Sequence, residues 1–295
     1  MDQSLKKALI VIGPTSSGKT GLSVHLAKMF NGEIVSSDSR QVYRGMDIGT
    51  GKATEKEMSG IPHHCIDIVN PDEEFTAYDF QQCAKAAMEN ITKRGKLPII
   101  AGGTGLYVKA VVDGLTFAGK RDDELRAKLE QLDNDTLFSR LKQIDPKSAQ
   151  RIDPSNKQRV MRAIEASEAS DSTFSESRKN EPADYTFLQI GIDVDRENLY
   201  EKINHRVHTM FDAGLEDEVS SLAEKYSWDA PALDAIGYRQ FRDEKLAEET
   251  IIEEIQKASR RYAKRQLTWF RADKRIKWIK TKDEAEKIVQ DYITS

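Results

Sequence analysis

Eight consecutive residues near the N-terminus have the types and the spacing of a phosphate-binding loop. Residues 13–20 fit the pattern G-x-x-x-x-G-K-[ST] and lie between an apolar run and a helical pattern. In such a loop the backbone N–H groups point at phosphate oxygens, and the following helix adds the positive end of its dipole. Lys19 supplies a mobile positive charge, and the Thr20 hydroxyl is placed to ligate Mg²⁺. The residues expected to bind a diphosphate or a nucleotide are Gly13, Pro14, Thr15, Ser16, Ser17, Gly18, Lys19 and Thr20.

A loop of this kind often belongs to an NTPase, which also needs an acidic residue at the end of a neighbouring strand to hold the metal ion. The apolar run 97–101 instead ends in Gly102 and Gly103. Asp67 and Asp193 are possible substitutes, although neither follows a long apolar run cleanly. ATP hydrolysis is therefore less expected than the loop alone indicates.

Asp38 directly follows the second apolar run of the chain, at a strand end that should lie within reach of the phosphate loop. A carboxylate there could act as a general base toward an incoming nucleophile. A helix cap or a turn explains an aspartate in this position equally well. The neighbouring Arg40 and Gln41 favour chemistry on a nucleic-acid base, because guanidinium and amide groups can hydrogen-bond base edges in pairs.

The elements around these residues alternate between strand and helix. Apolar runs at 8–12, 33–37 and 97–101 each end in a glycine- or aspartate-rich turn, and helical patterns at 18–30 and 78–94 lie between them. This alternation predicts a P-loop-type α/β fold with a doubly wound, mainly parallel sheet. Ligands bind at the carboxyl ends of such strands, so the three loops are expected to face one pocket.

The chain becomes polar and helix-rich over residues 116–184. We therefore expect a helical insertion within an α/β core that comprises residues 1–115 and 185–295. A strand-like run at 187–194 could return the chain to the sheet, and mostly helical sequence follows. The candidate helices of the insertion are residues 124–132, 136–144 and 156–169.

Composition limits the function classes. The 295 residues are 38% hydrophobic and 32% charged, with a net charge of −4, which argues against uniform, non-specific binding to nucleic acid but not against a local basic groove. Apolar runs are too short to span a membrane. Cys65 and Cys83 are expected as two reduced thiols in a cytoplasmic protein, since two cysteines make no disulfide framework and match no zinc motif.

The sharpest charge asymmetry lies at residues 257–280, where ten basic residues face one acid, Asp273, for a net charge of +9. On a helix with about 100° per residue, cations fall on one side and apolar residues on the other. This pattern favours contact with a phosphate backbone, although the acidic stretch 244–254 could balance a merely solvated face. The basic side holds Lys257, Arg260, Arg261, Lys264, Arg265 and Arg271, and the expected core side holds Ile251, Ile255, Ala258, Tyr262 and Trp269.

Nine segments along nearly the whole chain form one ordered set of motifs: residues 13–20, 38–50, 61–64, 102–107, 145–146, 156–163, 214–219, 235–240 and 261–271. Taken together, these motifs resemble tRNA dimethylallyltransferases. The match departs from the common pattern at Arg40, where methionine or another variable residue is usual, and at Gly51, where alanine is frequent.

The resemblance implies transfer of a dimethylallyl group from its diphosphate to the exocyclic amine of the adenosine on the 3′ side of certain tRNA anticodons. Asp38 then matches the family's general base, Thr104 a residue that orients the reacting groups, and Arg206 an arginine that grips the diphosphate. Mg²⁺ would help to stabilise charge on the leaving diphosphate. The absence of phosphoryl transfer agrees with the missing strand-end aspartate.

The resemblance also implies that the insertion grips the anticodon stem-loop of tRNA. Arg126 is the weakest candidate of the set, because a surface salt bridge explains it nearly as well. We expect a monomer that works in the cytoplasm. The expected tRNA-binding residues are Asp38, Ser39, Arg40, Gln41, Arg126, Gln158, Arg159, Val160, Met161, Arg162, Arg239, Arg260, Arg261 and Lys264.

Three other functions stay open on the sequence. A P-loop kinase for a nucleotide or small metabolite explains the loop and the fold, but neither the basic helix nor Asp38 with Gln41. An isopentenyltransferase for free adenine nucleotides would not need the insertion. A non-enzymatic RNA-binding protein would need neither Lys19 nor Asp38. The sequence also leaves open which tRNAs are modified, the order of substrate binding and whether ATP competes for the loop.

Overall fold

The computed structural model describes residues 5–117, 123–168, 184–243 and 245–295. These residues form two compact units. Unit 1 comprises Met1–Val112 and Ala183–Ser295, and unit 2 comprises Asp113–Pro182. The division falls within a few residues of the borders expected from the change in sequence character.

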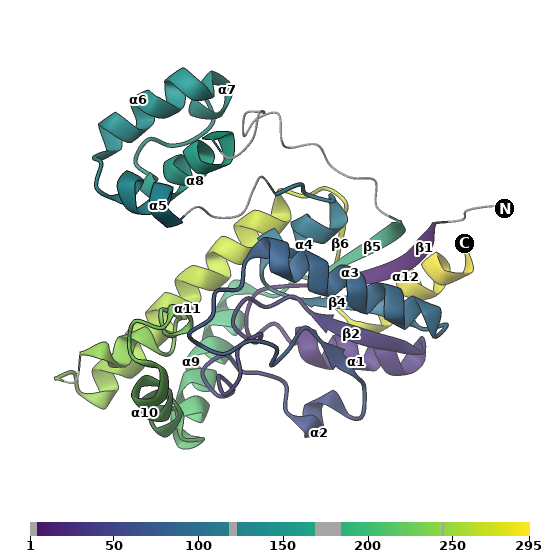
Figure 1. Cartoon of the computed structure of the whole chain (residues 1–295). Helices are drawn as coiled ribbons and strands as arrows, with labels where there is room; N and C mark the ends of the chain where they lie inside the picture. The colour runs from purple at the N-terminus through teal and green to yellow at the C-terminus, as the bar shows by residue number, and fades with distance from the viewer. Residues whose placement is uncertain (1–4, 118–122, 169–183, 244) are drawn as a thin grey trace. The chain divides into compact units, whose positions relative to one another are not determined.

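Unit 1 is built on a six-stranded sheet in the order β3-β2-β4-β1-β5-β6, in which every pairing is parallel (Figure 1). The parallel α/β fold expected from the sequence is therefore confirmed. Central strands such as β1 are apolar over most of their length, as befits strands that are covered on both faces. The strands are β1 (Lys6–Ile12), β2 (Gly32–Ser36), β3 (His63–His64), β4 (Leu97–Gly102), β5 (Tyr185–Ile192) and β6 (Ile276–Ile279).

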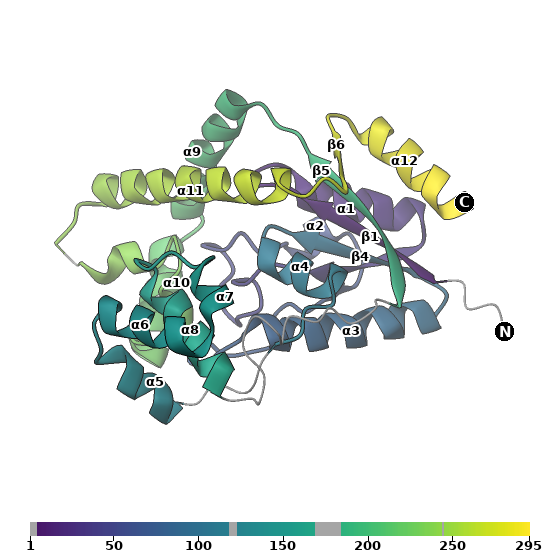
Figure 2. The same ribbon diagram turned by 90° about the horizontal axis from the view of Figure 1, so that it is seen from above.

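Helices cover both faces of the sheet (Figure 1). Alternate side chains of β1 point to opposite faces, so Ile10 packs with α3 and α4 while Leu9 packs with α1 and α12. Figure 2 shows α11 running lengthwise with its C-terminal end beside β5 and β6. The helices of unit 1 are α1 (Lys19–Met29), α2 (Glu55–Met58), α3 (Ala77–Lys93), α4 (Gly105–Val112), α9 (Arg196–Asp212), α10 (Leu215–Tyr226), α11 (Glu248–Arg271) and α12 (Lys282–Thr294), with 3₁₀ turns η1 (Pro231–Leu233) and η2 (Arg239–Arg242).

One half-buried carboxylate, that of Glu218, organises the loop that follows β2. Glu218 of α10 accepts hydrogen bonds from the backbone N–H groups of Asp47, Ile48 and Gly49 at 2.9, 2.7 and 3.0 Å. It also accepts one from the hydroxyl of Tyr238 at 2.6 Å. Three aligned amide dipoles and a hydroxyl satisfy the charge of Glu218, so this loop is tied to α10 at the edge of the sheet where the strands end.

Unit 2 has an apolar core of its own, and this core corrects one expectation. Val160 and Met161 were expected to contact tRNA, but both are fully buried. Their positions on α8 turn them toward Leu137 and Leu141 of α6, because the apolar face of each short helix must be covered. The helices of unit 2 are α5 (Asp123–Glu130), α6 (Asn134–Ile144), α7 (Pro146–Ala149) and α8 (Lys157–Glu168).

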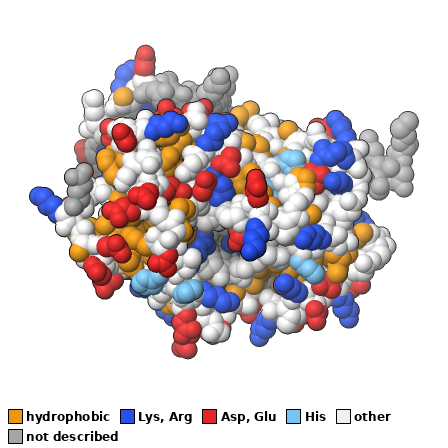
Figure 3. Space-filling model, turned by 90° about the horizontal axis from the view of Figure 1, so that it is seen from below, with side chains coloured by type: hydrophobic (Ala, Val, Ile, Leu, Met, Phe, Trp, Pro, Cys, Tyr) orange, Lys and Arg blue, Asp and Glu red, His pale blue; other side chains and the backbone are white. Residues whose placement is uncertain are grey.

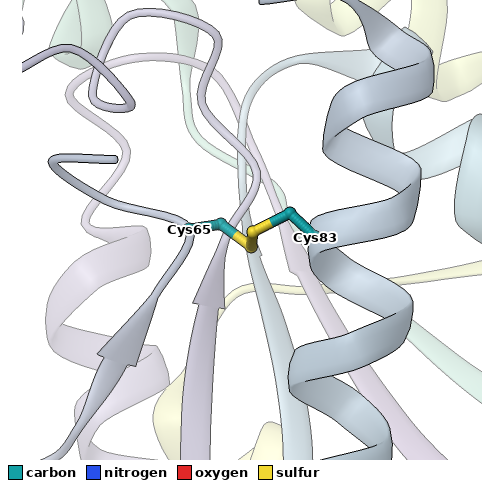
Figure 4. The surroundings of a disulfide bond; sticks show 2 residues. All are labelled: Cys65 and Cys83. Atoms are coloured by element: carbon teal, nitrogen blue, oxygen red, sulfur yellow. A yellow bond between two sulfur atoms is a disulfide. The ribbon is translucent and has the colours of Figure 1, made fainter. Parts of the chain in front are cut away.

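The two cysteines are not free thiols, contrary to expectation. Cys65, just after β3, and Cys83, on α3, form a disulfide with a Cα–Cα separation of 6.3 Å (Figure 4). That separation lies within the range of about 4.4–6.8 Å that a disulfide requires. The two residues are 18 positions apart in the sequence. They become neighbours only because the chain folds back after β3 and α3 packs beside that segment, which the spacing alone does not predict. None of the described helices is both long enough and apolar enough to cross a membrane.

Candidate active site and nucleic-acid interface

Three loops meet at the carboxyl ends of β1, β2 and β4, as the sheet topology predicts. The N–H of Thr104, after β4, donates to the Ser37 carbonyl at 3.2 Å. The Thr104 hydroxyl accepts from the Ser39 N–H at 3.0 Å. Thr104 therefore holds the second loop against the third, immediately beside Asp38.

The first loop has the conformation that an anion site needs. Ser16 and Gly18 have φ angles of +62° and +89°, which turn successive backbone N–H groups toward one side before α1 begins. A Cβ at Gly13 would lie 2.7 Å from the Ser17 hydroxyl, so the loop closes only around glycine. The hydroxyls of Ser16 and Ser17 are buried without a hydrogen-bond partner among the described residues. Such unsatisfied donors favour a polar ligand in this loop.

Two cations flank the loop. The Lys19 ammonium donates to the Pro14 carbonyl at 2.7 Å. Arg206 of α9 donates to the Thr15 hydroxyl and to the Thr50 carbonyl, both at 3.1 Å. Two helices thus bring one positive charge each to the same loop.

Burial makes both charges costly. It lowers the pKa of Lys19 to about 8; the nearby Asp38 carboxylate opposes the shift and Arg206 adds to it. Burial also lowers the pKa of Arg206, against the attraction of Asp38 and Glu57. Cations held at this cost are relieved when an anion binds, so the electrostatics favour a bound diphosphate.

Asp38 is half-buried and lies close enough to both cations to influence them. Its Oδ1 accepts a hydrogen bond from the Arg40 N–H at 2.9 Å, which is the turn role considered from the sequence. That bond occupies one carboxylate oxygen and orients the group. The turn role and the role as a base are therefore compatible.

Two aromatic residues near Asp38 were missed as site residues. Tyr262 of α11 was expected in the apolar core, yet its hydroxyl lies close enough to Thr104 and Asp38 for both to influence its pKa. Burial, followed by the Asp38 carboxylate, raises the pKa of Tyr262 to about 12. Burial likewise raises the pKa of Tyr107, with Tyr43 and Asp38 adding to the shift. Both tyrosines are thus neutral hydroxyls near the base, and only the folding of α4 and α11 onto the loops brings them there.

Arg40 and Gln41 do not lie open to a base in this conformation. The Arg40 guanidinium donates to the carbonyls of Pro231 and Ala232 at 3.3 and 3.4 Å. The Gln41 amide donates to the Gly51 carbonyl at 3.2 Å and accepts from the Ser36 hydroxyl at 3.2 Å. Base recognition by either residue would require exchange of these bonds and stays a prediction, as it does for half-buried Ser39.

Neither substitute for the missing strand-end aspartate works. Asp67 pairs with the buried ammonium of Lys52, and Asp193 lies 3.4 Å from Arg271. The described residues hold no group of three His, Cys, Asp or Glu side chains that could bind a metal ion. Thr20, in the first turn of α1, keeps its side chain exposed. With one hydroxyl and no carboxylate cluster, this site fits a metal ion that binds together with the phosphate groups of a ligand better than one held by protein carboxylates.

The basic helix α11 differs from expectation in two places. Arg260 is half-buried and bonds the Asn204 side chain, because α11 packs against α9 at that turn. Trp269 is 49% exposed although it was expected in the core stripe, and its ring lies against Gly105, where a Cβ would come within 2.2 Å. The side chains that are buried instead include Ala263, Gln266 and Phe270. The exposed cations of α11 are Lys257, Arg261, Lys264, Arg265 and Arg271, of which Arg261, Lys264 and Arg265 are neighbours on one stretch of the helix.

An open groove of about 1080 Å³ is lined by residues of α4 and α11 and by the segment that leads from α11 into β6. Val108, Val112 and Trp269 contribute apolar surface to it, and Arg261, Lys264 and Arg265 line it with positive charge. On another face, in Figure 3, acidic side chains gather on one side and basic ones on the other, so neither sign covers that face. A local cationic groove within a chain of net charge −4 is what the composition allowed.

In unit 2 the candidate RNA-binding cations have partners of their own. Arg126 lies 3.0 Å from Glu165 and 3.3 Å from Glu130, and it also bonds Gln158. Arg162 lies 3.4 Å from the same buried Glu165. The salt-bridge explanation of Arg126 therefore describes this conformation, whereas Arg159 is exposed on α8.

Arg239, another candidate for RNA contact, is accessible to solvent although it has an acidic neighbour. It is exposed, lies 3.8 Å from Asp234, and borders a shallow hollow together with Lys257 and Arg261. This hollow extends the cationic surface of α11 toward η2.

Comparison with known proteins identifies the family. A model of the IPP transferase family matches residues 41–273, which is more than half of the chain. This chain belongs to that family. Curated relatives are a tRNA dimethylallyltransferase of Anoxybacillus flavithermus, 45% identical over 95% of this chain and 92% of its own length, and one of Bacillus subtilis, 41% identical over 95% and 92%.

Solved structures of IPP transferases are similar over nearly the whole chain. A crystal structure of a tRNA isopentenylpyrophosphate transferase from Bacillus halodurans superposes with a TM-score of 0.73 at 40% identity, covering 98% of this chain and 96% of its own. A eukaryotic dimethylallyltransferase acting on tRNA superposes with a TM-score of 0.85 at 30% identity, covering 98% and 80%. The IPP transferase fold therefore includes both the core and the insertion.

Proposed function

We propose that this chain transfers a dimethylallyl group from dimethylallyl diphosphate to the exocyclic amine of the adenosine on the 3′ side of the anticodon in tRNA, releasing diphosphate. The observation that carries the proposal is the placement of one carboxylate, Asp38, near two half-buried cations, Lys19 and Arg206. The relatives, named as tRNA dimethylallyltransferases, support both the donor and the acceptor.

The reaction exchanges one bond to carbon for another. The amine nitrogen bonds to the allylic carbon while that carbon's bond to the diphosphate oxygen breaks. Asp38 accepts the proton that the amine loses, and the bond from Arg40 N–H keeps its carboxylate oriented. Lys19 and Arg206 stabilise the negative charge that grows on the departing diphosphate.

Mg²⁺ belongs to the leaving-group side of the proposed site. The exposed Thr20 hydroxyl and the diphosphate oxygens would hold it, and it would neutralise part of the charge that develops on the leaving group. Thr104, through its bonds to Ser37 and Ser39, would set the position of Asp38 relative to the allylic carbon.

The adenosine must leave the base stack of the anticodon loop to reach Asp38. We propose that the groove along α11 supports the RNA meanwhile: Arg261, Lys264 and Arg265 contact phosphates, and exposed Trp269 offers a ring for base stacking. We also propose that unit 2 grips the anticodon stem-loop, with Arg159 as its most accessible cation. We also propose that the chain acts as a monomer and that it works in the cytoplasm, where a tRNA substrate is available.

The acceptor is the part of the proposal that is easiest to test. Purified protein is incubated with dimethylallyl diphosphate, Mg²⁺ and either unmodified tRNA or AMP, and the products are digested to nucleosides for mass spectrometry. We expect one adenosine per tRNA to carry a dimethylallyl group, and no alkylated product from AMP. Alkylation of AMP alone would instead make the chain a transferase for free nucleotides.

A further inference from the structure

The side chain of Gln266 connects the phosphate loop with the loop that follows β4. It lies on α11, is 6% exposed, and uses both ends of its amide. Its Oε1 accepts the Thr15 N–H of the phosphate loop at 2.9 Å, and its Nε2 donates to the Gly103 carbonyl of the third loop at 2.9 Å. A Cβ at position 103 would lie 2.2 Å from Nε2, so the close approach depends on Gly103.

We infer that Gln266 is a positioning residue that fixes the distance between the diphosphate loop and the general base. This inference rests on the proposed function. One route of contacts runs from Thr15 through Gln266 to Gly103, whose neighbour Thr104 holds the Ser39 N–H next to Asp38. The leaving-group side and the proton-accepting side of the reaction are thus joined through one side chain.

Only an amide suits this position among common side chains of its size. The Thr15 N–H needs an acceptor and the Gly103 carbonyl needs a donor, and both must come from one planar group at fixed separation. Glutamate accepts but does not donate when ionised, and methionine does neither well. Thr15 is held a second time, because its hydroxyl accepts from Arg206 at 3.1 Å. Loss of Gln266 would leave that loop tied to α9 but not to the third loop.

The same face of α11 supports the third loop one turn earlier. Tyr262 precedes Gln266 by four residues, so both side chains point the same way, and the Tyr262 hydroxyl lies near Thr104 and Asp38. The inner face of α11 therefore aligns the reacting loops, while the outer face carries the exposed cations.

The test compares Gln266→Met and Gln266→Glu with Gln256→Met. Gln256 lies on the same helix and bonds the Asn204 carbonyl at 3.3 Å, away from the loops, so it controls for the loss of a glutamine from α11. We expect Gln266→Met to lower kcat for tRNA alkylation on the order of 100-fold, because a displacement of about 1 Å between reacting groups costs that much. Gln266→Glu keeps the bond to Thr15 and should lie between wild type and Gln266→Met in kcat.

Two binding measurements separate positioning from mere stability. Affinity for inorganic diphosphate, by calorimetry, should fall several-fold in Gln266→Met, while the Kd for tRNA and the midpoint of thermal unfolding stay close to those of Gln256→Met. Unchanged kcat in both Gln266 variants, with the wild type active, would overturn the inference. A wild type that binds diphosphate but alkylates no tRNA would instead overturn the proposed function. Equal losses of kcat, tRNA binding and thermal midpoint would show a purely structural role.

Discussion

The chain carries two kinds of cation, and they differ in burial more than in charge. Lys19 and Arg206 are enclosed at the phosphate loop and bonded to its backbone or hydroxyls. Arg261, Lys264 and Arg265 stand outward on α11 along an open groove. Enclosed charges act on a small anion at short range, whereas exposed ones act on a long polyanion and are screened by salt.

This contrast separates catalysis from attachment. Enclosed cations have shifted pKa values because burial penalises their charged forms, and a bound anion relieves that penalty. Exposed cations gain little from any one phosphate, but together they release counterions from RNA. Substitutions in the two groups should therefore change different measured quantities.

Substitution of Asp38, the carboxylate near Lys19 and Arg206, should have the largest effect on kcat. Asp38→Asn keeps an oxygen for the Arg40 N–H but is no longer a base, so kcat for tRNA alkylation should fall by roughly 10²–10⁴-fold. Because the carboxylate also attracts Lys19 and Arg206, its removal should leave diphosphate binding unchanged or tighter. Kinetics and calorimetry with inorganic diphosphate check both parts. Weaker diphosphate and tRNA binding together would make Asp38 a structural residue.

Removal of an enclosed cation should follow in size. Lys19→Ala should lower kcat on the order of 10²–10³-fold, the usual loss when one charge-stabilising donor is removed, and should weaken diphosphate binding. Affinity for tRNA at fixed salt should stay within two- to three-fold of wild type, a rough limit for loss of a charge outside the RNA contact. If Lys19→Ala lost affinity for tRNA but kept its affinity for diphosphate, the assignment of Lys19 to the diphosphate and not to the RNA would be wrong.

Removal of the exposed cations should give the opposite profile. The triple variant Arg261→Gln, Lys264→Gln, Arg265→Gln should reduce the slope of log Kd for tRNA against log salt by roughly 2–3, in proportion to three lost phosphate contacts. The kcat at saturating tRNA should change little. A matched triple variant at Lys225, Lys282 and Lys287, exposed on α10 and α12, should keep the wild-type slope. Equal slopes in all three proteins would show that RNA binds elsewhere.

The pH dependence should give a smaller, graded effect. Lys19 is protonated below its pKa of about 8 and neutral above it, so kcat/KM for dimethylallyl diphosphate should fall above about pH 8. The fall should approach tenfold per pH unit if the neutral form does not bind the diphosphate. The kcat alone should fall only at higher pH, because bound diphosphate raises the pKa of Lys19. Coincident profiles for kcat and kcat/KM would contradict this assignment.

The disulfide should affect stability while leaving the contrast between cation groups intact. Cys83→Ser should lower the free energy of unfolding by about 3 kcal/mol, the loss expected for opening a loop of this length. The kcat should stay near that of wild type, since Cys65 and Cys83 lie outside the loops. Denaturant unfolding with and without a reducing agent checks the effect, and a variant already as stable as wild type under oxidising conditions would show that the pair contributes nothing.

Sequence patterns were sufficient for three central strands and the loops that follow them, because motif, apolar run and turn coincide at Gly13, Asp38 and Gly102, but they did not predict the short edge strand β3. Local spacing also placed Lys19 at the start of a helix. It could not place Arg206, whose role came from the family resemblance, beside Thr15, since 191 residues separate them. Contacts of that range depend on how whole helices pack.

The errors share a cause. Trp269 and Tyr262 were assigned to a core stripe from helical periodicity alone, but Trp269 lies exposed on Gly105 and Tyr262 lies near the polar Thr104 and Asp38. Periodicity defines the faces of a helix without saying whether a polar loop or an apolar core covers each face. Val160 and Met161 were included with their charged neighbours because a motif marks a segment and not the direction of each side chain.

The central claim is that the enclosed loop holds the diphosphate of a prenyl donor and not a nucleotide to be hydrolysed. The most direct measurement follows diphosphate release and tRNA alkylation in the same reaction, with a parallel reaction that contains ATP in place of dimethylallyl diphosphate. We predict one diphosphate released for each alkylated adenosine, and no phosphate or ADP from ATP. Release of phosphate from ATP with unmodified tRNA would contradict the account.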